Sequence, residues 1–307
     1  MLYNRLLIFS LILLFTASAC SEEVVVKKEE INWKENQDPS HILVSVEGFS
    51  GPEAVRYDEQ LDVYFVSNFN GGGNERDSNG FISKVSASGE LLDLKFMVGT
   101  DESPLHAPRG MYITGDALWV ADVDGIHSFN KETGEHVNFL NFRGFNPGFL
   151  NDISIDADGN LFVTDTGTGG LYKVSGQRVS VATDSLPHRP NGITYEAANQ
   201  ILLVAPWGGA LDFYSWDSES ETYSLFGTAN GGGNYDGIEF VKGALLSASQ
   251  RDSSLHLMES GADRILIKTP GRPADIGVDT RRLNVAVPYI ALDKVDIWAL
   301  TNDSDSN

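Results

Sequence analysis

A short pattern recurs six times along this chain of 307 residues, and it constrains the fold more than any other feature. Each copy starts with an anchor of four residues and continues into short strands rich in β-branched and aromatic side chains. The anchors are Pro52-Glu53-Ala54-Val55, Pro108-Arg109-Gly110-Met111, Leu150-Asn151-Asp152-Ile153, Pro190-Asn191-Gly192-Ile193, Tyr235-Asp236-Gly237-Ile238 and Pro273-Ala274-Asp275-Ile276. Their average spacing is about 44 residues, which is the length of a four-stranded propeller blade. The repeat therefore predicts an all-β, six-bladed β-propeller spanning residues 41–300 as one domain.

The strand pattern also predicts how the ring closes. A second strand follows each anchor, for example residues 117–122 and 161–165, and a third strand follows the second. Five copies carry a fourth strand, but the sixth runs out of chain near Leu300. We expect residues 41–47 to supply the missing outer strand, because closure protects strand edges that would otherwise pair with other chains.

The N-terminal residues predict export and processing. Arg5 precedes an apolar run over residues 6–15 that is too short to span a bilayer, as in a signal peptide. Residues 16–20 are similar to a bacterial lipoprotein cleavage box ending in Cys20, the only cysteine of the chain. We therefore expect residues 1–20 to be a signal peptide and lipobox, and a lipid on Cys20 to anchor the protein on the periplasmic or cell-surface side of a membrane. The alternative is an ordinary secretory signal cut nearby.

The remaining ends of the chain read as segments outside the fold. Residues 21–40 are charged and poor in hydrophobic side chains, which predicts a flexible tether. Residues 301–307 are polar and predict a disordered tail.

The charge balance limits the kind of partner. Lys and Arg number 22 against 43 Asp and Glu, a net charge of −21. Nucleic acid is not an expected partner, because binding to phosphates needs basic patches. An acidic surface favours solubility, and it also permits the attraction of cations to a concave acidic site.

The anchors carry the candidate chemistry. In a propeller, the first strand of every blade lines the central channel, so the anchor side chains should converge at one mouth. These side chains are Glu53, Arg109, Asn151, Asn191, Asp236 and Ala274. Carboxylate and carboxamide oxygens suit Ca²⁺, whereas a structural zinc site would use Cys or His. The alternative is that Asn and Asp before Gly simply form turns.

With these residues the chain resembles the gluconolactonase/regucalcin family, which includes the luciferin-regenerating enzyme and is related to diisopropyl-fluorophosphatase and the paraoxonases. The resemblance covers roughly residues 41–300 and rests on Glu53, Asn151-Asp152, Asn191-Gly192 and Asp236-Gly237. It implies a divalent cation, Ca²⁺ first, held by Glu53, Asn191 and Asp236, with Asn151 as a ligand or a substrate contact. It also implies that Asp236 acts as base or nucleophile in the hydrolysis of a small-molecule lactone or related ester.

Two positions depart from that family. Sugar lactonases place an Arg two residues before the third-blade Asn, where this chain has Phe149. Arg109 opens the second blade, where it would either bind substrate oxygens or pair with Glu53 or Asp236 in place of a metal. The second arrangement would make the protein a non-catalytic propeller that binds a peptide, glycan or small ligand.

Further residues are weaker candidates for the same mouth. His188 and His106 precede anchors and are candidate proton shuttles, or else surface histidines. Trp207 and Tyr289 are candidate walls of an apolar substrate pocket, or else rim packing.

Overall fold

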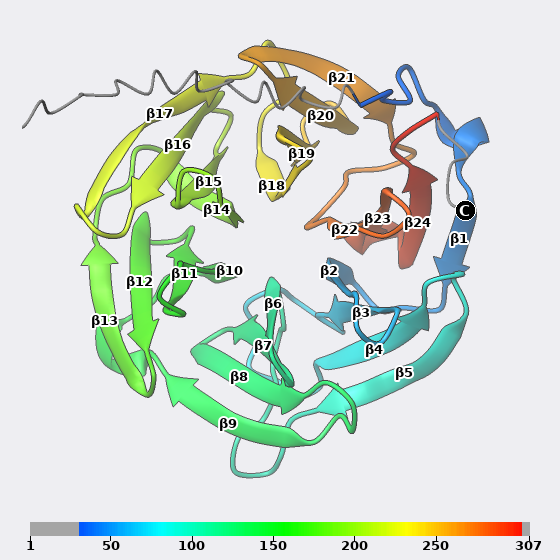
Figure 1. Cartoon of the computed structure of the whole chain (residues 1–307). Helices are drawn as coiled ribbons and strands as arrows, with labels where there is room; N and C mark the ends of the chain where they lie inside the picture. Colours follow the sequence, from blue (N-terminus) through cyan, green and yellow to red (C-terminus); the bar gives the residue numbers. More distant parts are fainter. Residues whose placement is uncertain (1–30, 303–307) are drawn as a thin grey trace, which may run out of the picture. The chain divides into compact units, whose positions relative to one another are not determined.

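Residues 31–302, the part of the chain that the computed structural model describes, form six four-stranded antiparallel sheets arranged in a ring (Figure 1). The innermost strands surround the centre of the ring, and the outermost strands form its rim (Figure 1). The predicted all-β, six-bladed propeller is confirmed.

The blades follow one another in sequence. The first two sheets contain β2 (Pro52–Asp58), β3 (Val63–Asn68), β4 (Phe81–Ser86), β5 (Leu91–Val98), β6 (Met111–Thr114), β7 (Ala117–Asp122), β8 (Gly125–Asn130) and β9 (His136–Asn141). The next two contain β10 (Leu150–Ile155), β11 (Leu161–Asp165), β12 (Gly170–Ser175), β13 (Arg178–Thr183), β14 (Arg189–Glu196), β15 (Ile201–Trp207), β16 (Asp212–Asp217) and β17 (Thr222–Thr228). The fifth contains β18 (Tyr235–Val241), β19 (Ala244–Ser249), β20 (Ser254–Glu259) and β21 (Ala262–Lys268).

The sixth sheet joins both ends of the propeller. Its strands are β22 (Gly277–Asp279), β23 (Asn284–Tyr289), β24 (Lys294–Ala299) and, at the outer edge, β1 (Val44–Glu47). β1 pairs antiparallel with β24, with Val46 opposite Val295. Short 3₁₀ helices lie at η1 (Pro39–His41), η2 (Arg143–Phe145) and η3 (Ile290–Leu292).

Burial decreases from the inner strands to the rim. Every residue of β3, β11 and β19 is buried, because each second strand is covered on both faces by neighbouring blades. β17 at the rim is almost wholly exposed. Apolar clusters fill the wedges between adjacent blades; Phe65, Met111 and Leu118 belong to the one between the first two. This packing fixes the inner strands, and the anchors lie in or directly before these strands.

A β-bulge at the start of four inner strands redirects the anchor side chains. The pairing register shifts between Pro52 and Ala54, and again across Asn151, Asn191 and Asp236. A bulge breaks the inward–outward alternation of a strand and turns one side chain out of register. These four anchors are therefore parts of the inner strands rather than isolated turn formers, whereas Arg109 and Ala274 precede β6 and β22.

The glycines after the anchors allow neighbouring blades to approach closely. A Cβ on Gly192 would lie 2.3 Å from the carbonyl oxygen of Asp236, and one on Gly237 would lie 2.1 Å from Oδ1 of Asp275. Both contacts are too short for any side chain, so Gly is required there for packing.

The compact unit extends beyond the predicted boundaries. Trp33 is buried and forms a bridge with Thr301, and Gln37 forms one with Ile267. The prediction of a free tether up to residue 40 and a tail from residue 301 is therefore wrong for these positions. Cys20 and the predicted signal peptide lie outside the described residues. Within residues 31–302, none of the helices has the length and apolar character needed to cross a bilayer.

Candidate functional site

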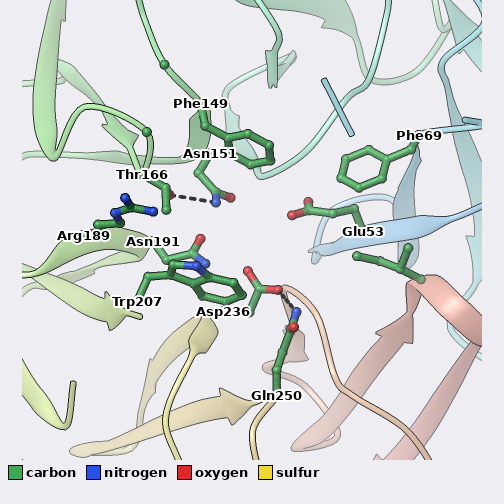
Figure 2. Close-up of a pocket in the computed structure, with 13 residues that line it drawn as sticks. Glu53, Phe69, Phe149, Asn151, Thr166, Arg189, Asn191, Trp207, Asp236 and Gln250 are labelled. Carbon is green, nitrogen blue, oxygen red and sulfur yellow. Dashed lines mark hydrogen bonds between the residues drawn. The ribbon is translucent and has the colours of Figure 1, made fainter. Parts of the chain in front are cut away.

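Four anchor side chains from four blades converge on one cavity. Glu53, Asn151, Asn191 and Asp236 lie at the second or third position of β2, β10, β14 and β18, and Figure 2 shows them facing a shared space. All four are buried; Glu53 is 3% exposed and Asp236 4%. The structure thus brings these four residues together, as the repeat predicted.

Hydrogen bonds orient the two carboxamides toward the cavity. The amide nitrogen of Asn151 donates to Oγ1 of Thr166 over 3.0 Å, which leaves the amide oxygen of Asn151 for the cavity (Figure 2). Thr166 in turn donates to the carbonyl oxygen of Pro190, next to Asn191. The oxygen of Asn191 is buried and has no hydrogen-bond partner among the described residues.

The two carboxylates are held in an unfavourable electrostatic environment. Oε2 of Glu53 is buried without a hydrogen-bond partner in residues 31–302. Burial, followed by repulsion from Asp236, raises the pKa of Glu53 well above its ordinary value. Burial also raises the pKa of Asp236 to about 7, although hydrogen bonds from Gln250 and Asn191 oppose the rise. Neither carboxylate forms an ion pair within residues 31–302, although the charges of Arg109 and Arg56 partly oppose the rise in the pKa of Glu53.

A divalent cation fits this set of groups. The site offers carboxylate and carboxamide oxygens only, which are the ligands that Ca²⁺ prefers. Two of these oxygens, on Glu53 and Asn191, are buried and unpaired within the described chain. No cluster of three or more His, Cys, Asp or Glu side chains suited to a metal occurs in residues 31–302, so the site combines two carboxylates with two carboxamides. Their two negative charges match one divalent cation.

The cavity above these oxygens has a volume of about 480 Å³, within the range of small-molecule sites. Phe69, Phe149, Trp207 and Ile290 form its apolar walls. Arg189 and Gln250 are further polar lining residues (Figure 2). Trp207 therefore forms part of the cavity wall, as the sequence predicted. Tyr289 does not line this cavity; it is buried beside Lys294.

Arg109 lies behind the cavity wall, whereas the sequence placed it either against the substrate or in a pair with Glu53 or Asp236. Its guanidinium is fully buried and donates to the carbonyl oxygens of Leu150 and Gly73 and to the side-chain oxygen of Asn74. It stacks 3.7 Å from the ring centre of Phe149. Within the described chain it forms no ion pair with Glu53 or Asp236 and does not line the cavity. Burial lowers its pKa to about 10. Arg109 therefore packs behind Phe149 and does not line the cavity, although its charge partly opposes the rise in the pKa of Glu53.

The two histidines also lie away from the reacting groups. His188 does not line the cavity; its ring contacts Tyr214 and lies 3.9 Å from a carboxylate oxygen of Asp212. His188, predicted as a proton shuttle or substrate contact, is therefore not among the residues that line this cavity. His106 is buried, and its ring nitrogen accepts a hydrogen bond from the backbone of Ser78.

A second set of charged groups, missed in the sequence, lies behind the anchors. Arg56 of β2 binds Asp152, Glu239 and Asp275, which belong to three other blades. Asp152 also accepts a hydrogen bond from the backbone of Ile193, beside Asn191. The repeat carried a signal for this set, because Arg56 stands three residues after Glu53 and Glu239 stands three residues after Asp236. Arg56 ties four blades together directly behind the site.

Solved structures similar to this chain include two assigned to gluconolactonases. A structural-genomics protein assigned as a gluconolactonase superposes with a TM-score of 0.65 at 15% identity, covering 87% of this chain and 97% of that one. A gluconolactonase from Xanthomonas campestris, described as important in glucose secondary metabolic pathways, gives a TM-score of 0.64 at 16% identity, with 90% and 99% covered. A virginiamycin B lyase from Staphylococcus aureus gives 0.57 at 11% identity, with 84% and 99% covered.

These comparisons establish the fold of the chain. It is a six-bladed propeller of the kind found in gluconolactonases, and the resemblance stated from the sequence is confirmed at that level. Neither a protein-family model nor a curated protein sequence matches the chain.

Proposed function

We propose that this protein is a divalent-cation-dependent hydrolase of lactones or related esters. One observation carries the proposal: two buried carboxylates and two carboxamide oxygens face a small-molecule cavity, and two of those oxygens are unpaired within the described chain. The gluconolactonase fold supports it, although fold alone does not determine activity.

We assign the binding of the cation to Glu53, Asn151, Asn191 and Asp236, with Ca²⁺ as the leading candidate. When bound, the cation would supply a Lewis acid that polarises the carbonyl oxygen of the substrate. The apolar walls, with Phe149 held in place by Arg109, would exclude water from the rest of the bound molecule.

Asp236 is the proposed general base. Its carboxylate would take a proton from a water molecule as that water adds to the carbonyl carbon. The ring or ester C–O bond then breaks, and the leaving oxygen receives a proton. Gln250 donates to the Asp236 carboxylate and would hold it in place during the transfer.

Turnover of a lactone panel tests the proposal. The parent with Ca²⁺ should release acid in a pH-stat, and excess EGTA should stop the release. Asp236→Asn should lower kcat by about 10²–10⁴-fold. Asp212→Asn is a matched control, because Asp212 pairs with His188 away from the cavity. Absence of turnover with every divalent cation tried would contradict the proposal and favour a non-catalytic binding propeller.

An isotope experiment separates base from nucleophile. In a single turnover in H₂¹⁸O, a general base places ¹⁸O in the product acid. Label recovered in the Asp236 carboxylate instead shows a covalent acyl intermediate that water opens at the carboxyl carbon of Asp236.

We also propose that the protein is an exported lipoprotein anchored through Cys20. The charged start, short apolar run and lipobox-like sequence of residues 1–20 support this proposal.

A further inference from the structure

Arg189 occupies a distinctive position in the cavity. It is the first residue of β14, stands two residues before Asn191 and pairs across the strand with Trp207. Among the described residues that line this cavity, it is the only Lys or Arg. Figure 2 shows it beside Thr166, on the side of the cavity opposite Glu53.

The guanidinium of Arg189 is not used within the described part of the protein. It forms no hydrogen bond or ion pair with any residue in 31–302, and the residue is exposed. Arg56 and Arg109, in contrast, direct their guanidinium groups to carboxylates and carbonyls of the chain. Arg189 therefore has its donors free for a ligand.

The charges of the cavity favour an anion at this position. Glu53 and Asp236 contribute two negative charges and Arg189 one positive charge. One divalent cation at the carboxylates would leave the cavity with a net charge of +1. A planar guanidinium binds a carboxylate through two parallel hydrogen bonds, which favours this anion.

The apolar walls of the cavity favour a ligand whose remaining part is also apolar. Phe69, Phe149, Trp207 and Ile290 surround the cavity with apolar surface. Arg189 holds the place in the fourth blade that Phe149 holds in the third, because each stands two residues before the anchor Asn of its blade. A polyhydroxylated body would leave its hydroxyls unpaired against these walls, whereas an apolar body would not.

We propose that Arg189 binds a carboxylate carried by the substrate, so the substrate class is a lactone or ester with a free carboxylate on an apolar body. This inference rests on the proposed hydrolase function for its substrate, but its ligand-binding part can be tested alone. Arg189 acts as a specificity-determining residue and takes no proton in the reaction.

Paired substrates test the specificity. The full chain with Ca²⁺ should hydrolyse mono-4-nitrophenyl adipate with a higher kcat/KM than neutral 4-nitrophenyl hexanoate. Arg189→Gln should lower kcat/KM for the adipate by about 10- to 100-fold, mainly through KM, and change the hexanoate less than twofold. Arg189→Lys should restore part of the loss. Arg178→Gln, at the exposed start of rim strand β13, is the matched control. Equal losses for both esters in Arg189→Gln would overturn the proposal.

Binding of a non-reacting carboxylate separates this proposal from the hydrolase function. Phenylacetate should bind the Ca²⁺-loaded parent at least tenfold more tightly than phenylacetamide, measured by ligand-observed NMR, and Arg189→Gln should abolish that preference. The result would support the anion site even if neither ester is hydrolysed, in which case the hydrolase function alone fails. No saturable binding of phenylacetate, or equal binding by parent and Arg189→Gln, would overturn the proposal.

Discussion

Glu53→Gln should change from a stabilising to a destabilising substitution when Ca²⁺ is added. Without a cation, Oε2 of Glu53 is buried and unpaired among the described residues, and Asp236 repels its charge. Leaving such an acceptor unpaired costs about 1–3 kcal/mol, more when it is charged. The neutral carboxamide removes the charge and gains an N–H that can donate. We expect Glu53→Gln to be about 1–2 kcal/mol more stable than the parent in excess EGTA.

Ca²⁺ should invert this order. A ligand at 100 times its Kd stabilises the folded state by about 2.7 kcal/mol. The parent should gain this amount, whereas Glu53→Gln should gain little because it has lost a charged ligand. The parent should then be the more stable protein by about 1 kcal/mol.

Urea unfolding at pH 8, followed by tryptophan fluorescence, measures both differences. Glu90→Gln is the control, because the exposed Glu90 makes no side-chain hydrogen bond or ion pair within residues 31–302. If Glu53→Gln destabilises the protein equally in EGTA and in Ca²⁺, the reasoning is wrong, and Glu53 serves only the packing of the channel.

Three other predictions concern the charged groups around Arg56, the pH dependence of stability and the lipid on Cys20. Arg56→Met should cost about 3–5 kcal/mol in urea unfolding, because the buried Asp152 and Asp275 and the partly buried Glu239 lose their cation; a loss below 1 kcal/mol would refute this. Burial opposes protonation of His256, but Asp263 and Asp252 outweigh it and raise its pKa above 6.5. The protonated His256 therefore contributes its full stabilisation below pH 6.5, and this stabilisation is lost as the pH rises through the higher pKa of the folded state. His256→Gln should flatten the dependence of the unfolding free energy on pH in that range. An unchanged pH dependence would contradict this prediction. Cys20→Ala should move the protein from the membrane to the soluble fraction, and unchanged fractionation would exclude lipid anchoring.

The repeat was readable from the sequence because each blade buries its strands in the same way. Second strands such as residues 117–122 and 161–165 match β7 and β11 residue for residue, since their flanking turns and apolar runs are local signals. The convergence of Glu53, Asn151, Asn191 and Asp236 followed from their equal place in the repeat.

Side-chain directions were not readable, because long-range contacts determine them. Arg109 turns behind Phe149 to reach the carbonyls of Gly73 and Leu150, which no local pattern specifies. The same applies to Arg189, whose place in the cavity depends on Trp207 and on the neighbouring blade. The third blade has Phe149 and the fourth has Arg189 at the same position of the repeat, and both line the cavity.

Calorimetric titration of Ca²⁺ into the metal-free protein tests the central claim most directly. The account predicts one Ca²⁺ per chain, with binding lost in both Glu53→Gln and Asp236→Asn and kept in Asp212→Asn. No binding by the parent, or the same binding in the first two variants as in the parent, would contradict the assignment of a cation to the mouth of the channel.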